Sequence, residues 1–144
     1  MNLSRRQALG LAGLPLLASV VPAEAQGSAL TFLFVEAGDC EPCKRWHSNE
    51  GHWWKTAPEY QRVNTVFVRA KRIRNALDDA VWPQHLRRHR DAAPPRGMPA
   101  YYVLRHDELM LSTAGYTAWR REVYPALREM VATANAVRAL QARS

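Results

Sequence analysis

Two cysteines with two residues between them form the most reactive pattern in this sequence. Cys40 and Cys43 are the only cysteines in the 144-residue chain. They follow an apolar run at 29–37 that is typical of a buried strand, and Pro42 suits the first turn of a helix. The free N–H groups at a helix N-terminus favour the thiolate, which is the reactive form. The pattern therefore predicts that an exposed Cys40 attacks a disulfide and that a more buried Cys43 resolves the product.

Other uses of the same cysteines make different demands. A structural zinc site needs two further ligands, and the chain has no second cysteine pair. Haem attachment needs a histidine directly after the second cysteine, where Lys44 stands. A purely structural disulfide would close a short loop and stabilise the fold by only about 2 kcal/mol. His47 leaves open a copper or zinc site made with Cys40 and Cys43, although an ordinary helix residue is the plainer interpretation.

A proline at the start of a later strand is the second feature of chemical interest. The residues Gly97-Met98-Pro99 come directly before a run rich in tyrosine and aliphatic side chains. A cis bond before proline is a minority state that its surroundings must hold, which suits a functional site. A trans proline that merely opens a strand is the alternative, and the cysteine pair favours the cis state.

A strand, a Cys-x-x-Cys pair at a helix start and a proline leading into a hairpin together resemble the thioredoxin-like superfamily, over about residues 29–132. The resemblance implies that Pro99 is cis and packs against the disulfide, and that Met98 offers its backbone to the substrate. Residues 35–47 and 115–127 look like periplasmic thioredoxins of the SoxS type. Those proteins reduce a blocked thiol on a sulfur carrier in bacterial sulfur oxidation.

The chain departs from the thioredoxin pattern at two positions. Thioredoxins have a buried aspartate six residues before the first cysteine, where this chain has Phe34. They also have tryptophan directly before that cysteine, where Asp39 stands here and is expected to cap the helix. Glu36, four residues before Cys40, is a possible proton acceptor for Cys43, or else a strand-end residue that faces solvent.

The charges around the pair suggest a direction of exchange. Glu41 opposes a neighbouring thiolate and so stabilises the disulfide relative to the dithiol, while Lys44 and Arg45 act the opposite way. The proline before the second cysteine resembles reducing thioredoxins. We therefore expect a monomeric, moderately reducing oxidoreductase without cofactor or metal. Its partners would be a protein disulfide or blocked thiol and a membrane thiol donor. The alternatives are a copper- or zinc-handling protein using the same cysteines and a redox-inactive binding module.

The first 25 residues have the composition of an export signal. Arg5 and Arg6 precede an apolar run at 8–21, and Ala23-Glu24-Ala25 matches a signal peptidase site. The pair of arginines resembles a twin-arginine signal, with the general export route and an uncleaved anchor as alternatives. We expect a thioredoxin-like domain at 26–144 in the periplasm. The net charge of +7 leaves open an acidic partner or an anionic surface, although a solvated basic surface is the plainer interpretation, and nucleic acid is not expected for an exported protein.

Strands and helices in a definite order must position these residues. Hydrophobic patterns predict strands at 29–37, 63–69, 99–104 and 109–113, the last two forming a hairpin. They predict helices at 40–50, ending before Gly51, and at 71–91 with a break at Pro83. A final helix follows Thr117, kinked or divided in two at Pro125 and frayed from about Asn135. The basic cluster at 87–90 is expected to be a solvated helix end. The predicted fold class is α/β, thioredoxin-like, with a four-stranded mixed sheet and helices on both faces.

Overall fold

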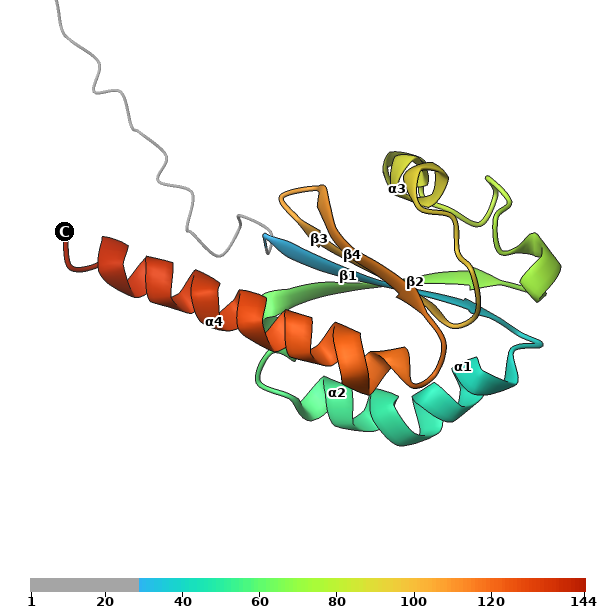
Figure 1. Ribbon diagram of the computed structural model, residues 1–144, viewed down its shortest axis with the longest axis horizontal. Helices are drawn as coiled ribbons and strands as arrows, with labels where there is room; N and C mark the ends of the chain where they lie inside the picture. Colours follow the sequence, from blue (N-terminus) through green and yellow to red (C-terminus); the bar gives the residue numbers. More distant parts are fainter. Residues whose placement is uncertain (1–28) are drawn as a thin grey trace, which may run out of the picture.

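The computed structural model describes residues 29–144 and contains one four-stranded sheet (Figure 1). Its strands are β1 (Leu30–Ala37), β2 (Val63–Ala70), β3 (Ala100–Arg105) and β4 (Glu108–Ala114). All four lie close to their predicted positions. The predicted export signal at 1–25 lies outside the described residues.

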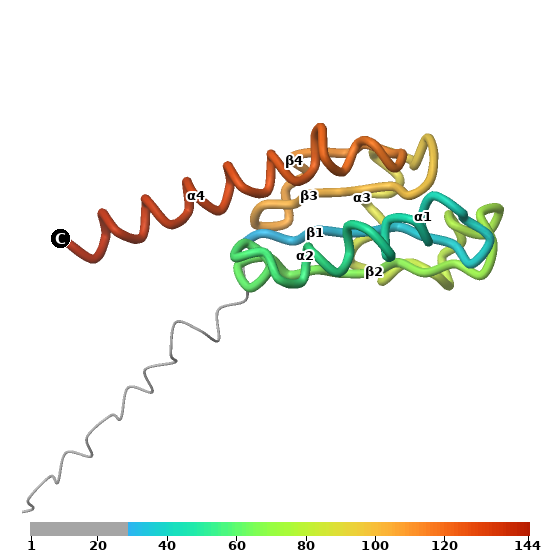
Figure 2. The backbone as a smooth tube through the Cα atoms, turned by 90° about the horizontal axis from the view of Figure 1, so that it is seen from below, coloured from blue at the N-terminus to red at the C-terminus, as the bar shows by residue number. Residues whose placement is uncertain are grey.

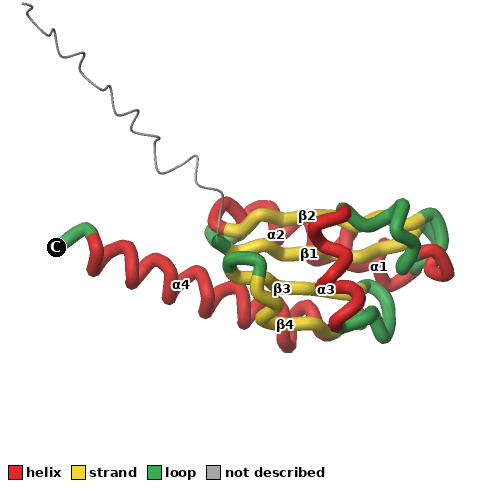
Figure 3. Tube along the Cα trace, turned by 90° about the horizontal axis from the view of Figure 1, so that it is seen from above, coloured by secondary structure: helices red, strands yellow, loops and turns green. Residues whose placement is uncertain are grey.

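The order of the strands across the sheet is β2-β1-β3-β4. β1 is parallel to β2 and antiparallel to β3, and β3 is antiparallel to β4. A parallel pair needs a crossover, and the helical residues 41–56 between β1 and β2 provide it. Helices cover both faces of the sheet, as Figures 1 and 3 show. This is a thioredoxin-like fold, and the predicted fold class is confirmed.

β1 supplies residues to the hydrophobic cores on both sides of the sheet. Phe32 and Phe34 point to one face, and Leu33 and Val35 point to the other, because side chains alternate along a strand. All four side chains are fully buried. A strand buried on both faces reads as a continuous apolar run, and for this reason β1 could be predicted from composition.

The helix after Cys40 is longer than predicted. It comprises α1 (Glu41–Trp46), the π-helical segment η2 (His47–Gly51) and α2 (His52–Thr56) in direct succession. Gly51 was expected to end the helix but lies inside it, packed against the Trp46 ring. A Cβ atom at Gly51 would lie 3.0 Å from Trp46 Cζ3, so the glycine allows the tryptophan to pack closely against the helix backbone.

The C-terminal helix packs on the same face of the sheet. The π-helical segment η6 (Trp119–Val123) leads into α4 (Tyr124–Gln141), which extends beyond the sheet in Figure 2. The helical run is continuous past Pro125, but it changes from π-helix to α-helix at Tyr124, directly beside this proline. The helix also continues past Asn135, where fraying was expected. No helix among residues 29–144 is long and apolar enough to cross a membrane.

Aromatic rings fill the core between β1, β3 and these helices. The Trp46 ring centroid lies 4.3 Å from that of Phe34 and 5.2 Å from that of Trp119. Within residues 29–144, three buried polar groups lack a hydrogen-bond partner: Trp46 Nε1, Trp119 Nε1 and Tyr101 OH. Each unpaired group costs about 1–3 kcal/mol, which the close aromatic packing must offset.

The opposite face is covered by residues 71–93, and their structure differs from the prediction. The expected helix is wrong before Pro83, where only η4 (Ile73–Asn75) is helical. The expected break at Pro83 and the helix after it are present, as η5 (Gln84–Leu86) followed directly by α3 (Arg87–Ala92). Trp82 packs edge-on against Tyr102 of β3, with their ring centroids 5.6 Å apart. Its Nε1–H donates a hydrogen bond to the Ala76 carbonyl at 2.7 Å. These contacts with the sheet and within the segment replace a regular helix.

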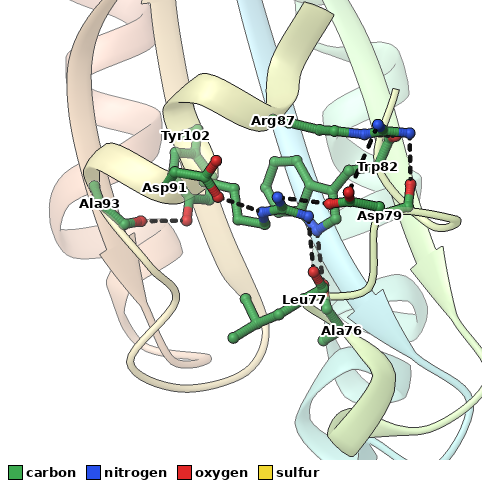
Figure 4. A network of polar contacts seen from close by, with 9 residues as sticks. Ala76, Leu77, Asp79, Trp82, Arg87, Asp91, Ala93 and Tyr102 are labelled. Atoms are coloured by element: carbon green, nitrogen blue, oxygen red, sulfur yellow. Dashed lines mark hydrogen bonds and ion pairs between the residues drawn. The ribbon is translucent and has the colours of Figure 1, made fainter. Parts of the chain in front are cut away.

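Arg90 joins several parts of this segment, and its partners Leu77, Asp79 and Asp91 are labelled in Figure 4. Its side chain is only 10% exposed and pairs through Nη2 with Asp79 at 2.8 Å. Nη1 donates to the Leu77 carbonyl at 2.7 Å and Nε to Asp91 at 2.8 Å, while the guanidinium lies 5.9 Å from the Trp82 ring centroid. The expectation that this basic helix end is solvated is therefore wrong for Arg90.

Alkaline pH should destabilise the fold through Tyr102. Its phenol donates to the Ala93 carbonyl, and burial raises the pKa of Tyr102 to about 12. Tyrosine in an unfolded chain titrates near pH 10, so the unfolded state loses its proton first. The stability contributed by the protonated phenol is therefore present below about pH 10 and is lost as the pH rises towards 12.

The measurement is urea unfolding, followed by tryptophan fluorescence, at about pH 9 and pH 11. We expect the midpoint to fall between these values in the wild type and to fall less in Tyr102→Phe, which has no phenol to ionise at this position. An equal fall in both proteins would show that Tyr102 does not provide this pH dependence.

Candidate disulfide-exchange site

Cys40 and Cys43 are joined by a disulfide at the start of α1, with Cα atoms 5.3 Å apart. Cys40 is the N-cap of the helix, and the Cys43 N–H donates to its sulfur at 3.2 Å. Asp39 was expected to be the cap. Instead its Oδ1 accepts a hydrogen bond from the Ile73 N–H at 2.8 Å. An N–H of the first helical turn, that of Cys43, is therefore directed at the sulfur of Cys40, which is the arrangement that stabilises a thiolate there.

Both cysteines are buried, each with about 1% of its surface exposed. The prediction that Cys40 is exposed is therefore wrong for the disulfide form. The pair belongs to the aromatic core cluster, where partly buried Met98 packs. A partner sulfur can therefore reach Cys40 only if the residues packed around the disulfide move.

The Met98–Pro99 bend lies at the same end of the sheet as the disulfide. The peptide bond between the two residues is cis, and Pro99 is buried while Met98 is partly buried. Ala100 pairs with Val35, so the bend runs alongside the last residues of β1. The Pro99 carbonyl accepts a hydrogen bond from the Gly115 N–H at 2.8 Å. The turn before Cys40, the bend and the loop after β4 therefore meet at one end of the sheet (Figure 1).

Glu36 is buried and faces the helix. Its Oε1 accepts a hydrogen bond from Arg69 Nε at 2.5 Å, and its Oε2 bonds with His47 Nε2. The interpretation of Glu36 as a solvent-facing residue is therefore wrong. His47 lies one turn after Cys43, so the carboxylate contacts the helix that carries the disulfide. The role of Glu36 as a proton acceptor stays a prediction.

The metal interpretation required Cys40, Cys43 and His47 to gather around one ion. His47 Nε2 bonds with Glu36 instead. Among residues 29–144, no group of three or more His, Cys, Asp or Glu side chains is arranged to hold a metal ion.

A polar network links the helix to the loop after β4, and the sequence analysis missed it. Glu50 is buried in η2, and its Oε1 accepts from Arg120 Nε at 2.8 Å and from the Tyr116 hydroxyl at 3.3 Å. Asn49 donates to the same hydroxyl at 3.2 Å, and the Arg45 guanidinium lies 5.5 Å from the Tyr116 ring centroid. Glu50 thus holds Tyr116 beside the helix that begins at the disulfide.

Tyr101 lies close to this network on the core side. Burial raises its pKa, and the nearby charge of Glu50 and the phenol of Tyr116 raise it further. The side chain is therefore a neutral phenol at any ordinary pH. The only visible signal for this network in the sequence was Gly115-Tyr116, which belongs to the family resemblance.

No protein-family model matches the sequence, and no curated protein is significantly similar to it. The solved structures that resemble the chain include two thioredoxins. The oxidised thioredoxin of Plasmodium falciparum is 14% identical, with a TM-score of 0.46, over 69% of this chain and 83% of that one. The thioredoxin of Malassezia sympodialis, Mala s 13, is 13% identical, with a TM-score of 0.45, over 72% and 78%. Because these likenesses are weak, the fold assignment rests on strand order, strand direction and the position of the disulfide.

Removal of the Glu50 carboxylate should destabilise the protein and free Tyr116. Loss of a buried charge-assisted hydrogen bond costs about 1–3 kcal/mol, so Glu50→Ala should lower the free energy of unfolding by about that amount. Urea unfolding measures the change. Glu122→Ala, which removes an exposed glutamate from neighbouring η6, is the matched control and should have little effect. Equal stability of the two variants would contradict the structural role of Glu50.

Proposed function

We propose that this chain is a thiol–disulfide oxidoreductase in which Cys40 attacks the substrate and Cys43 resolves the mixed disulfide. The observation that carries the proposal is the disulfide at the start of α1, with the Cys43 N–H directed at the Cys40 sulfur at 3.2 Å. The same N–H bond stabilises a thiolate on Cys40 once the disulfide is opened. Cys43 lies inside the first turn and is bonded to Cys40, so it is in position to resolve the mixed disulfide.

The exchange has two displacement steps. In the reduced protein, the Cys40 thiolate attacks one sulfur of the substrate disulfide, and the other substrate sulfur leaves as a thiolate that takes up a proton. Cys43 then loses its proton, and its thiolate attacks the Cys40 sulfur, which releases the second substrate thiol. Two electrons pass to the substrate and the Cys40–Cys43 disulfide forms. We assign the uptake of the Cys43 proton to Glu36, the buried carboxylate that contacts the same helix through His47.

The bend at Met98 and Pro99 serves as the substrate platform. Met98 is only partly buried, and it packs against the core cluster that contains the disulfide. A substrate chain that lies against the Met98 backbone would displace the Met98 side chain and bring its own sulfur to Cys40. Because the disulfide form is buried, the partner that reopens the disulfide must also dock at the bend.

We propose that the protein works as a reductant in the periplasm. The export signal predicted at 1–25 supports this location. The resemblance to SoxS-type proteins suggests that the substrate is a blocked thiol on a sulfur carrier. A membrane thiol protein would return the dithiol state. Glu41 between the cysteines disfavours a thiolate, although its ion pair with Lys44 at 3.5 Å moderates this effect.

Replacement of the resolving cysteine should trap the substrate. In Cys43→Ser the first step proceeds but the second cannot, so a covalent complex through Cys40 accumulates. We expect mass spectrometry of the periplasmic fraction, from cells that produce the full chain, to detect a complex that dithiothreitol releases. Cys40→Ser is the matched control and should trap nothing. Trapping by Cys40→Ser alone would reverse the assigned order of attack.

The reduction potential tests the direction of exchange. We expect the Cys40–Cys43 pair, equilibrated with glutathione buffers and quantified after alkylation, to have a potential more negative than about −200 mV. A potential near −120 mV, which is typical of strong oxidants, would overturn the reducing assignment.

A further inference from the structure

Exposed cations flank the candidate site on two sides. Lys71, Arg72 and Arg74 follow β2, and Arg96 precedes the Met98–Pro99 bend. All four residues are exposed. In the part of the chain that the structure describes, no ion pair or side-chain hydrogen bond engages any of them. We call these four residues the basic rim.

Two backbone hydrogen bonds hold the segment with Lys71, Arg72 and Arg74 against the residues that precede the disulfide. The Gly38 N–H bonds with the Lys71 carbonyl at 3.1 Å, and Asp39 accepts from the Ile73 N–H at 2.8 Å. Gly38 and Asp39 lead directly into Cys40. A Cβ atom at Gly38 would lie 2.8 Å from the Lys71 oxygen, so this close approach requires glycine. The rim therefore has a defined place beside the reactive sulfur.

Carboxylates close to the site do not neutralise the rim. Asp39 is engaged by a backbone N–H, and Glu41 pairs with Lys44 at 3.5 Å. Asp78 accepts a hydrogen bond from Asn75 Nδ2 at 2.9 Å. Glu41 is offset by Lys44, whereas Asp39 and Asp78 keep their negative charge because their donors are neutral amides. The four rim cations outnumber these two carboxylates, so the balance of charge at this end of the sheet is positive.

We infer that the protein partner carries acidic residues beside the sulfur that Cys40 attacks. This inference rests on the proposed function and adds to it the chemical character of the substrate. Unpaired cations at a docking surface raise association rates with acidic partners by about 10–1000-fold, and the gain falls as salt is added. Burial of the disulfide makes such guidance useful, because a partner must dock before its sulfur can reach Cys40.

The test compares two disulfide-bonded peptides of equal length that differ only in the flanking residues, glutamate in one and glutamine in the other. Pre-reduced full chain is mixed with each peptide, and the released peptide thiols are followed in a single turnover. We expect the wild type to exchange about tenfold faster with the glutamate peptide at low ionic strength. The two rates should converge at about 0.5 M salt, where screening is strong.

Variants locate the effect. The double variant Arg72→Gln with Arg74→Gln should bring the ratio of the two rates close to one. Its rate with the glutamine peptide should stay unchanged, which also shows that the variant is folded. Arg138→Gln with Arg143→Gln removes two exposed cations from the far end of the chain and should keep the wild-type ratio.

The outcomes separate the two claims. Equal wild-type rates with both peptides at low salt would overturn the inference and leave the proposed function intact. An unchanged ratio in the Arg72 and Arg74 variant would also overturn it. Exchange with neither peptide would overturn the proposed function, and the inference with it.

Discussion

Burial of β1 on both faces, with only Thr31 partly exposed, is the constraint on which this structure depends. The strand pairs along both edges, with β2 on one side and β3 on the other, and its side chains enter both cores. Its residues have no freedom to shift, because a slip of one position would exchange the two faces. The strand ends at Ala37, three residues before Cys40, so the disulfide is carried on the most firmly held part of the chain.

The parts of the fold that could be predicted are those with short-range causes. The apolar run of β1 and the short link between β3 and β4 are local patterns that need no knowledge of the rest of the chain. The segment 71–91 looked helical because its spacing of apolar residues is compatible with a helix. Its actual path follows from Trp82 against Tyr102 and from the bonds of Arg90, which joins residues up to 13 positions apart.

The same division holds for the site. The spacing of Cys40 and Cys43 and the proline after Met98 could be recognised, since each is a local feature. Burial of Cys40 could not, because it depends on what the fold places over the disulfide. Glu50 and Arg120 are 70 positions apart in the sequence, and no pattern within either helix predicts the bond between them. Long-range contacts thus decide how accessible the pair is, while the local sequence decides which atoms react.

Gly38 gives one position unusual influence over the whole site. Its missing side chain is what lets the backbone of Lys71 approach within hydrogen-bond distance of the turn before the disulfide. Any larger residue would push the two segments apart without touching either cysteine or any cation. The spacing between the disulfide turn and the segment after β2 therefore depends on one exposed glycine, which a map of surface residues would pass over.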